Sequence, residues 1–136
     1  MKESADRLKQ SNIRITPQRL GVYRILKQEA GHLTAEQIHE KIKKKFPGVS
    51  LATVYAILEL FKEKKLVQEI RIKIDKSCFE IRVDGHHHFL CKKCGRIFDV
   101  DIASCPALEK KGVDGHLIEE HQGYFYGICR MCKKRR

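Results

Sequence analysis

Residues 50–61 read S-L-A-T-V-Y-A-I-L-E-L-F, and this stretch decides the expected fold of the first half of the chain. Ser50 is a favourable N-cap, because its hydroxyl can accept a hydrogen bond from one of the first free backbone N–H groups of a helix. The apolar residues after it recur at helical spacing and predict one buried face, made of Val54, Ile57, Leu58 and Phe61. Lys64 and Lys65 close the predicted helix, where cations interact favourably with the helix dipole.

Two further helices are predicted before this one. Thr16 is a good cap for a segment that has Pro17 at its first helical position, and apolar residues recur through about Gln28. Residues 34–37, T-A-E-Q, match the capping-box pattern, and Pro47-Gly48 ends the segment that they begin.

Two alternating runs follow, at residues 66–70 and 78–82, and a polar turn joins them. Three short helices followed by a two-stranded ribbon are typical of the winged-helix form of the helix-turn-helix motif. We therefore expect a winged-helix DNA-binding domain over residues 1–83, in which the helix beginning at Ser50 enters the major groove.

The second half of the chain has a different texture. After a hinge at residues 83–85, short strands are predicted at residues 88–90, 96–100, 116–120 and 124–128. A helix of about ten residues from Ser104 connects two of them. We expect residues 84–136 to form a small α/β domain, which makes the whole chain an α+β protein of two domains.

The charge of the chain is concentrated in its first half. The formal net charge is +11, of which residues 1–83 carry +8 and residues 84–136 carry +3, and the tail at residues 133–136 supplies four positive charges. If the chain has a surface that binds a polyanion, that surface belongs to the first half, although a solvated basic face is an equally good interpretation of charge alone. No stretch approaches about 18 apolar residues, and the polar N-terminus lacks the apolar core of a signal peptide. We expect a cytoplasmic protein without a membrane span.

Four of the six cysteines form two C-x-x-C pairs, Cys91/Cys94 and Cys129/Cys132. One such pair is also compatible with a redox motif, but two pairs predict a tetrahedral Zn²⁺ site with four thiolate ligands and no open position for substrate. Because 34 residues separate the pairs, the ion would join distant strands in a structural role. Cys78 and Cys105 have no such spacing and are interpreted as buried thiols.

Three consecutive histidines, His86, His87 and His88, precede the first cysteine pair. In an extended segment His86 and His88 point to one face and His87 to the other. Two imidazoles on one face suit a first-row transition metal, while a polar patch beside the zinc site is the alternative interpretation.

Motifs of one known family run nearly from end to end of this sequence. They are R-I-T-P-Q-R at 14–19, H-L-T-A at 32–35, S-L-A-T-V-Y at 50–55, F-E at 79–80, H-H-H at 86–88, C-K-K-C-G at 91–95 and Y-G-I-C at 126–129, followed by Cys132. With these motifs the sequence resembles the ferric uptake regulators, whose relatives sense iron, zinc, manganese, nickel or peroxide.

The resemblance implies a homodimeric transcriptional repressor that binds palindromic double-stranded DNA when a regulatory divalent metal is bound. The metal ligands that it implies are His32, Glu80, His86, His88 and Asp99. Since the first two belong to the DNA-binding half and the other three to the dimerisation half, a bound ion would set the angle between the halves. The implied cofactors are structural Zn²⁺, one per chain, and regulatory Fe²⁺ or Mn²⁺, with regulatory Zn²⁺ as a further possibility.

Two residues bear on what is sensed. Glu80 is typical of iron-type members, whereas the peroxide sensor (PerR) has aspartate there. At the position of Asp99, in contrast, the sequence is more similar to the peroxide sensor than to the iron regulators that have glutamate. Fe²⁺ is the preferred regulatory metal, and peroxide sensing through iron-catalysed histidine oxidation is the alternative. The resemblance also indicates an additional metal site with His87 and His121, for which Glu109 is the nearest acid.

The DNA contacts that the resemblance implies are Arg14 and Arg19 near the phosphates or the minor groove, and Ser50, Thr53 and Tyr55 on the recognition helix. A tyrosine there can touch a thymine methyl group. A core position for Tyr55 is the alternative, but other residues already supply the buried face, so we expect the ring to be exposed. The family usually has a polar residue where this chain has Ala56.

The same residues also bear on two rival functions. A metallohydrolase would need an open site with a general base, and neither H-E-x-x-H nor an H-x-E followed by P-C-x-x-C occurs, so we expect no enzyme and no small-molecule substrate. A zinc-bearing nucleic-acid-binding adaptor would lack metal-dependent affinity and operator preference.

Overall fold

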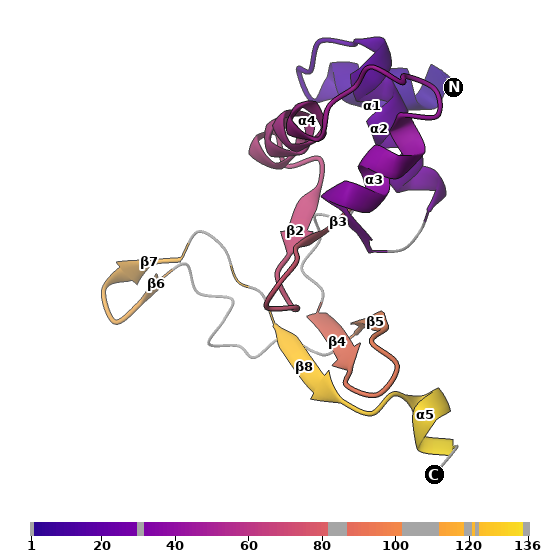
Figure 1. The fold of residues 1–136 in the computed structure, drawn as a ribbon. Helices are drawn as coiled ribbons and strands as arrows, with labels where there is room; N and C mark the ends of the chain where they lie inside the picture. The colour runs from indigo at the N-terminus through magenta and orange to yellow at the C-terminus, as the bar shows by residue number, and fades with distance from the viewer. Residues whose placement is uncertain are drawn as a thin grey trace. The chain divides into compact units, whose positions relative to one another are not determined.

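The computed structural model describes residues 2–29, 32–81, 87–101, 112–118, 121 and 123–134. The chain divides into two compact units, Met1–Val83 and Asp84–Arg136 (Figure 1). We call them the first unit and the second unit. None of the helices in the described ranges has the length and apolar character needed to cross a membrane.

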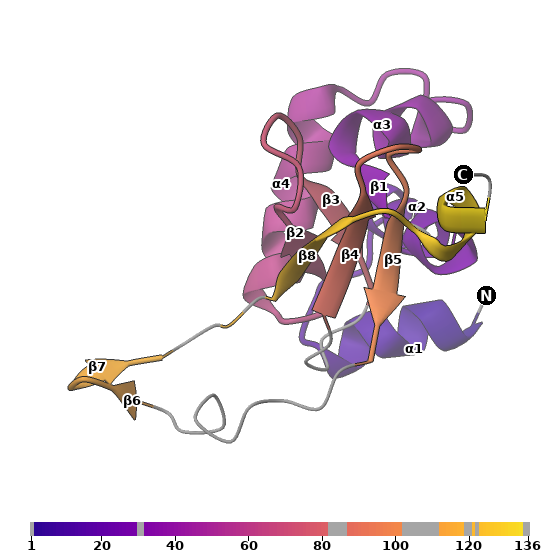
Figure 2. The ribbon, with the colours of Figure 1, turned by 90° about the horizontal axis from the view of Figure 1, so that it is seen from below.

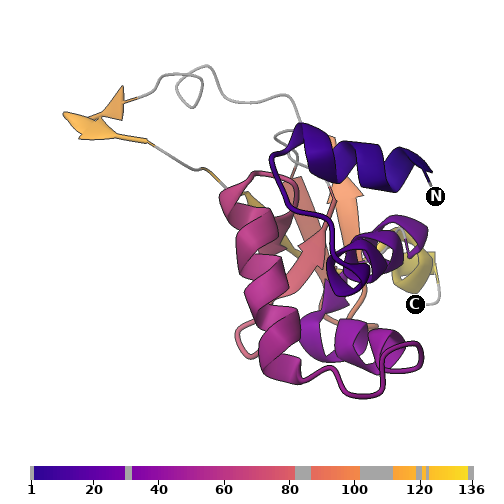
Figure 3. The same ribbon diagram turned by 90° about the horizontal axis from the view of Figure 1, so that it is seen from above.

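Four helices make up most of the first unit: α1 (Lys2–Gln10), α2 (Pro17–Gln28), α3 (Ala35–Ile42) and α4 (Leu51–Glu63). The helices α2 and α3 pack against each other and against α4, while α1 packs against α2 (Figure 3). The core between them is apolar, and its largest fully buried side chains include Leu8, Ile38, Leu58 and Phe61.

The three helices expected from capping signals begin where those signals predicted. The Thr16 hydroxyl accepts a hydrogen bond from the backbone N–H of Arg19 at 3.2 Å, and the Ser50 hydroxyl accepts one from Thr53 at 3.1 Å. Thr34 and Gln37 form both bonds of the capping box. These local bonds satisfy N–H groups that a helix leaves free at its start.

Helix α1 was not predicted from the sequence. Residues 2–10 are mostly polar, so they carry little apolar periodicity, but Leu8 is fully buried. An ion pair between Glu3 and Lys27, with 3.3 Å between oxygen and nitrogen, joins α1 to α2. The helix is therefore stabilised by its packing rather than by a strong local pattern.

The wing of the first unit is a three-stranded antiparallel sheet in the order β1-β3-β2, made of β1 (Leu33–Thr34), β2 (Gln68–Ile70) and β3 (Cys78–Glu80). The predicted ribbon corresponds to β2 and β3. The strand β1 was not predicted; it pairs with β3, and Leu33 lies opposite Phe79. Cys78 is buried, as expected. The α+β class with a winged helix-turn-helix is confirmed.

The second unit contains a three-stranded sheet in which β4 (His87–Cys91) lies between β5 (Ile97–Val100) and β8 (Tyr124–Gly127) (Figure 2). The pairing of β4 with β5 is antiparallel, and that with β8 is parallel. A hairpin of β6 (Gly112–Val113) and β7 (His116–Leu117) and the short helix α5 (Arg130–Lys134) complete the described elements. Neither β6 nor α5 was predicted, and the helix expected from Ser104, like Cys105, lies outside the described residues.

Candidate functional site

The four cysteines of the two C-x-x-C pairs come together at the end of the second unit's sheet. Their Sγ atoms all lie within 4.8 Å of one another. Cys91 ends β4, and the parallel pairing of β4 with β8 places Cys91 opposite Gly127, two residues before Cys129. Strand pairing therefore brings together two pairs that are distant in sequence.

Backbone N–H groups surround these sulfur atoms. The N–H groups of Cys94 and Cys129 each donate to Sγ of Cys91 at 3.4 Å, and the N–H of Cys132 donates to Sγ of Cys129 at 3.4 Å. The bond from Cys94, followed by that from Cys129, outweighs desolvation and lowers the pKa of Cys91 to about 6. Thiolate is the form that binds metal. The cluster fits a closed structural Zn²⁺ site, as predicted.

A histidine and a carboxylate meet in the first unit. Nε2 of His32 lies 3.0 Å from Oε2 of Glu80, and both side chains are only 10% exposed. The pairing of Leu33 with Phe79 explains this contact, since His32 directly precedes β1 and Glu80 ends β3. We call His32 and Glu80 the first half-site.

The other oxygen of Glu80 has a partner that the sequence analysis missed. Gln68 lies opposite Glu80 in the pairing of β2 with β3, and its side-chain amide donates to Oε1 of Glu80 at 2.8 Å. Hydrogen bonds to a ligating carboxylate set its orientation toward a metal. Correct alignment of the predicted hairpin would have identified Gln68, but the sequence contains no motif that marks it.

A second histidine and carboxylate meet in the second unit. His88 in β4 is the cross-strand partner of Asp99 in β5, and Nε2 of His88 lies 3.4 Å from Oδ1 of Asp99. His88 is 3% exposed. We call this pair the second half-site; His86 lies outside the described residues. Each half-site offers nitrogen and oxygen ligands of the kind that suits divalent first-row metals.

The two histidines expected at an additional site are also neighbours. The rings of His87 and His121 have their centroids 5.7 Å apart and meet edge to face. Nδ1 of His87 is buried and has no hydrogen-bond partner within the described part of the chain. An additional metal at these histidines stays a prediction, and Glu109 lies outside the described residues.

The residues expected to contact DNA lie on the first unit. Ser50, Thr53 and Tyr55 are exposed at the N-terminal end of α4, and Tyr55 is 41% exposed, as predicted. The guanidinium of Arg19 donates to the backbone carbonyl of Arg14 at 3.0 Å, which ties these two residues together before α2. Their contacts with DNA stay predictions.

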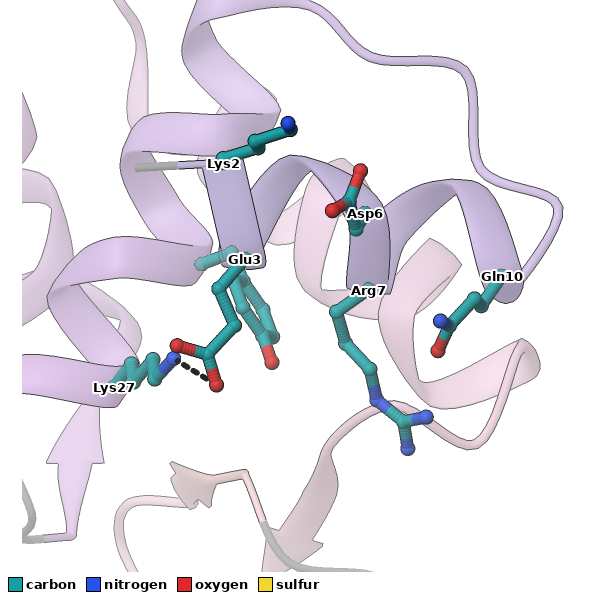
Figure 4. Close-up of a pocket in the computed structure, with 7 residues that line it drawn as sticks. Lys2, Glu3, Asp6, Arg7, Gln10 and Lys27 are labelled. Carbon is teal, nitrogen blue, oxygen red and sulfur yellow. Dashed lines mark ion pairs between the residues drawn. The ribbon is translucent and has the colours of Figure 1, made fainter.

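A polar cavity of about 610 Å³ lies beside α1 and α2 in the first unit (Figure 4). The Glu3–Lys27 ion pair lies in its wall, and Figure 4 shows Arg7 and Gln10 farther along α1. Among the described residues, none of the predicted site residues lines this cavity. We assign it no part in metal or DNA binding.

The family model described as the Ferric uptake regulator family matches residues 10–126. The chain belongs to this family. The resemblance found in the sequence is thus confirmed. Members of the ferric uptake regulator family are transcription regulators rather than enzymes, and this chain is a metal-responsive regulator of that kind.

Individual relatives are similar over nearly the whole chain. The peroxide operon regulator of Bacillus subtilis (strain 168) is 34% identical over 99% of this chain and 94% of its own length. The solved Campylobacter jejuni peroxide stress regulator is 33% identical, with a TM-score of 0.68 and coverage of 96% of this chain and 97% of that one. A zinc uptake regulator complexed with zinc and DNA shares the fold, with a TM-score of 0.75 at 21% identity and coverage of 98% and 93%.

Proposed function

We propose that this member of the ferric uptake regulator family is a cytoplasmic repressor that binds palindromic double-stranded DNA as a homodimer when a regulatory divalent metal, Fe²⁺ in the first place, is bound. The observation that carries the proposal is the pairing of an imidazole with a carboxylate in each unit, His32 with Glu80 and His88 with Asp99. Two ligands are too few for a regulatory ion, so we infer that both half-sites and His86 serve one ion.

The function of this ion follows from the separate origin of its ligands. When bound, it supplies the positive charge that holds imidazole and carboxylate groups of the two units together. His32 and Glu80 would then be fixed relative to His88 and Asp99, and with them the recognition helix relative to the dimerisation unit. In a symmetric dimer the two recognition helices must lie roughly 34 Å apart to enter successive major grooves.

The DNA-binding surface is proposed on the first unit, residues 1–83. This unit carries a formal charge of +8, and Arg14 and Arg19 would contact phosphates while Ser50, Thr53 and Tyr55 face the bases. Phosphate contacts supply affinity, whereas contacts in the groove supply sequence preference. The fold is compatible with this role, since the zinc uptake regulator with the same fold was solved with zinc and DNA.

DNA affinity measured anaerobically with Fe²⁺, Mn²⁺ and Zn²⁺, alongside metal content, tests the proposal. A duplex from the promoter of the protein's own gene should bind tightly only when the regulatory metal is present. Glu80→Ala should lose this metal dependence and keep the structural zinc, whereas Tyr55→Ala should weaken DNA binding with metal affinity unchanged. Equal affinity for any duplex with and without metal would instead support a zinc-bearing adaptor.

Peroxide sensing is the second candidate, and the 34% identity to the peroxide operon regulator favours it. Glu80 argues for the first candidate, because a glutamate reaches farther than an aspartate and can close the coordination shell of iron against peroxide. We expect the Fe²⁺ form to keep its DNA binding in low micromolar peroxide and Glu80→Asp to be more sensitive. Mass spectrometry decides between them: one oxygen atom added to the wild-type His32 peptide, with release of DNA, would establish a peroxide sensor.

A further inference from the structure

The exposed tyrosine of the recognition helix is tethered to another helix. The hydroxyl of Tyr55, on α4, donates a hydrogen bond to Oε1 of Glu36 at 3.1 Å. Glu36 lies in the first turn of α3. The bond therefore joins the tip of a proposed base-contacting side chain to the neighbouring helix of the same unit.

Among the described residues, the Tyr55 hydroxyl has one hydrogen-bond partner, Glu36. Ala52, one turn before Tyr55 on the exposed face of α4, has a methyl group too short to hold a phenol in place. A cavity of about 230 Å³ lies beside the ring. Its lining comprises Glu36, Tyr55, Glu59, Glu69, Asp75, Lys76, Ser77 and Phe79. Because Tyr55 is partly exposed and borders this cavity, the bond to Glu36 restricts the rotamers of its ring.

The protonation states of both partners preserve this bond near neutral pH. The backbone N–H of Glu36 is the main group that lowers the pKa of its carboxyl, and the Tyr55 hydroxyl lowers it further, so the group accepts as a carboxylate. Burial, followed by the bond to Glu36, raises the pKa of Tyr55, so the phenol remains a donor. A carboxylate beside a DNA-binding face repels phosphates, so a role for Glu36 must lie in something other than affinity.

We propose that Glu36 is a positioning residue for operator specificity: its carboxylate fixes the orientation of the exposed Tyr55 ring, in which the ring contacts a thymine C5-methyl group. This inference rests on the proposed role of Tyr55 in reading DNA. Glu36 itself touches no base. It acts by removing the rotamers in which the phenol turns away from the groove.

Replacing thymine by deoxyuridine tests the contact, because the substitution removes only the methyl group. The probe is a duplex selected from a random library by the metal-loaded wild type, prepared with thymine or deoxyuridine at each site position. Loss of one buried methyl group should weaken wild-type binding about fourfold at the contacted position. Tyr55→Ala should bind both duplexes equally.

Variants of Glu36 separate positioning from charge. Glu36→Ala should reduce the thymine preference to less than about twofold, and Tyr55→Phe, which lacks the donating hydroxyl, should do the same. Glu36→Gln removes the charge but retains an acceptor oxygen, so it should keep the fourfold preference. Glu59→Gln is the matched control, since Glu59 is also on the exposed side of α4 and has no hydrogen bond to Tyr55 among those described. It should leave the preference unchanged.

The possible outcomes distinguish the positioning role of Glu36 from the proposed contact of Tyr55 with DNA. If Glu36→Ala keeps the full thymine preference while Tyr55→Ala loses it, Tyr55 reads DNA without help and the positioning role is wrong. If the wild type shows no thymine preference and Tyr55→Ala binds as tightly as the wild type, the role of Tyr55 fails and the inference falls with it. Thermal unfolding of each variant with zinc bound verifies that the fold is intact.

Discussion

The cysteine cluster and the two half-sites differ in where their ligands come from. All four thiols belong to the second unit and lie within 4.8 Å of one another, with backbone N–H groups donating to the sulfur atoms. The two half-sites lie in different units: His32 and Glu80 belong to the first unit, and His88 and Asp99 belong to the second. A site contained in one unit can stabilise that unit, whereas the proposed shared ion would make the arrangement of the two units depend on metal.

The largest effect is expected from breaking the cysteine cluster. Cys129→Ser should remove the structural zinc, the dimer and the fold of the second unit, because zinc contributes on the order of 10–16 kcal/mol of apparent binding energy to such sites. Zinc content and sedimentation measure this directly. Cys78→Ser, at a buried thiol outside the cluster, is the control that should keep the zinc. A zinc-free Cys129→Ser dimer with unchanged melting temperature would refute the structural role.

Removing a ligand of a half-site should have a smaller effect, which changes metal and DNA binding but not the zinc site or the dimer. His88→Ala should keep one zinc per chain and the dimer but lose metal-stimulated DNA binding, with metal affinity falling beyond the roughly 10–100-fold expected for loss of an outer-shell partner. Isothermal titration with Mn²⁺ and DNA binding in the same buffer measure both quantities. Loss of zinc from this variant would show that the two sites are not independent.

An acid titration should destabilise the two units at different pH values. Burial raises the pKa of Glu69, but Lys62, Ser77 and Arg71 more than offset this and lower it from 4.5 to about 2. A depressed pKa in the folded state stabilises the first unit above about pH 4.5, and this contribution, roughly 3 kcal/mol, is lost as the pH falls through 2. The side chain of Glu69 is only 14% exposed, so solvent screening is small.

Zinc release should therefore precede the loss of the first unit's helices in an acid titration, since protons compete with zinc for the thiolates. A chelating dye and far-ultraviolet circular dichroism follow the two events in one experiment. Glu69→Gln should be less stable than the wild type at pH 7, with the difference vanishing near pH 2. An undiminished difference at pH 2 would contradict this assignment.

The smallest effect concerns the orientation of one ligand. Gln68→Ala should weaken regulatory metal binding by about tenfold, because Glu80 loses the hydrogen bond to its Oε1 and is no longer held in place. The visible spectrum of bound Co²⁺ reports whether the coordination changes. Zinc content should not change. If metal affinity remains as in the wild type, Gln68 has only a structural part in the sheet.

The sequence was most informative where its signals act over a few residues. Thr16, Thr34 and Ser50 predicted three helix starts, because a capping side chain bonds an N–H group three residues later. The two C-x-x-C pairs predicted the zinc cluster by the same logic of short spacing. His32 carried no local signal and was identified only through the family resemblance.

The sequence by itself therefore determined the start of α2, α3 and α4, the exposure of Tyr55 on its helix and the nature of the zinc ligands. Only the tertiary structure decided the formation of α1, the addition of β1, and the partners of two polar groups. Gln68 and Glu80 are 12 residues apart, and Glu36 and Tyr55 are 19 residues apart. At such separations no helical or strand periodicity relates two side chains. Their contact depends on strand register and helix packing, which the whole core of the unit sets.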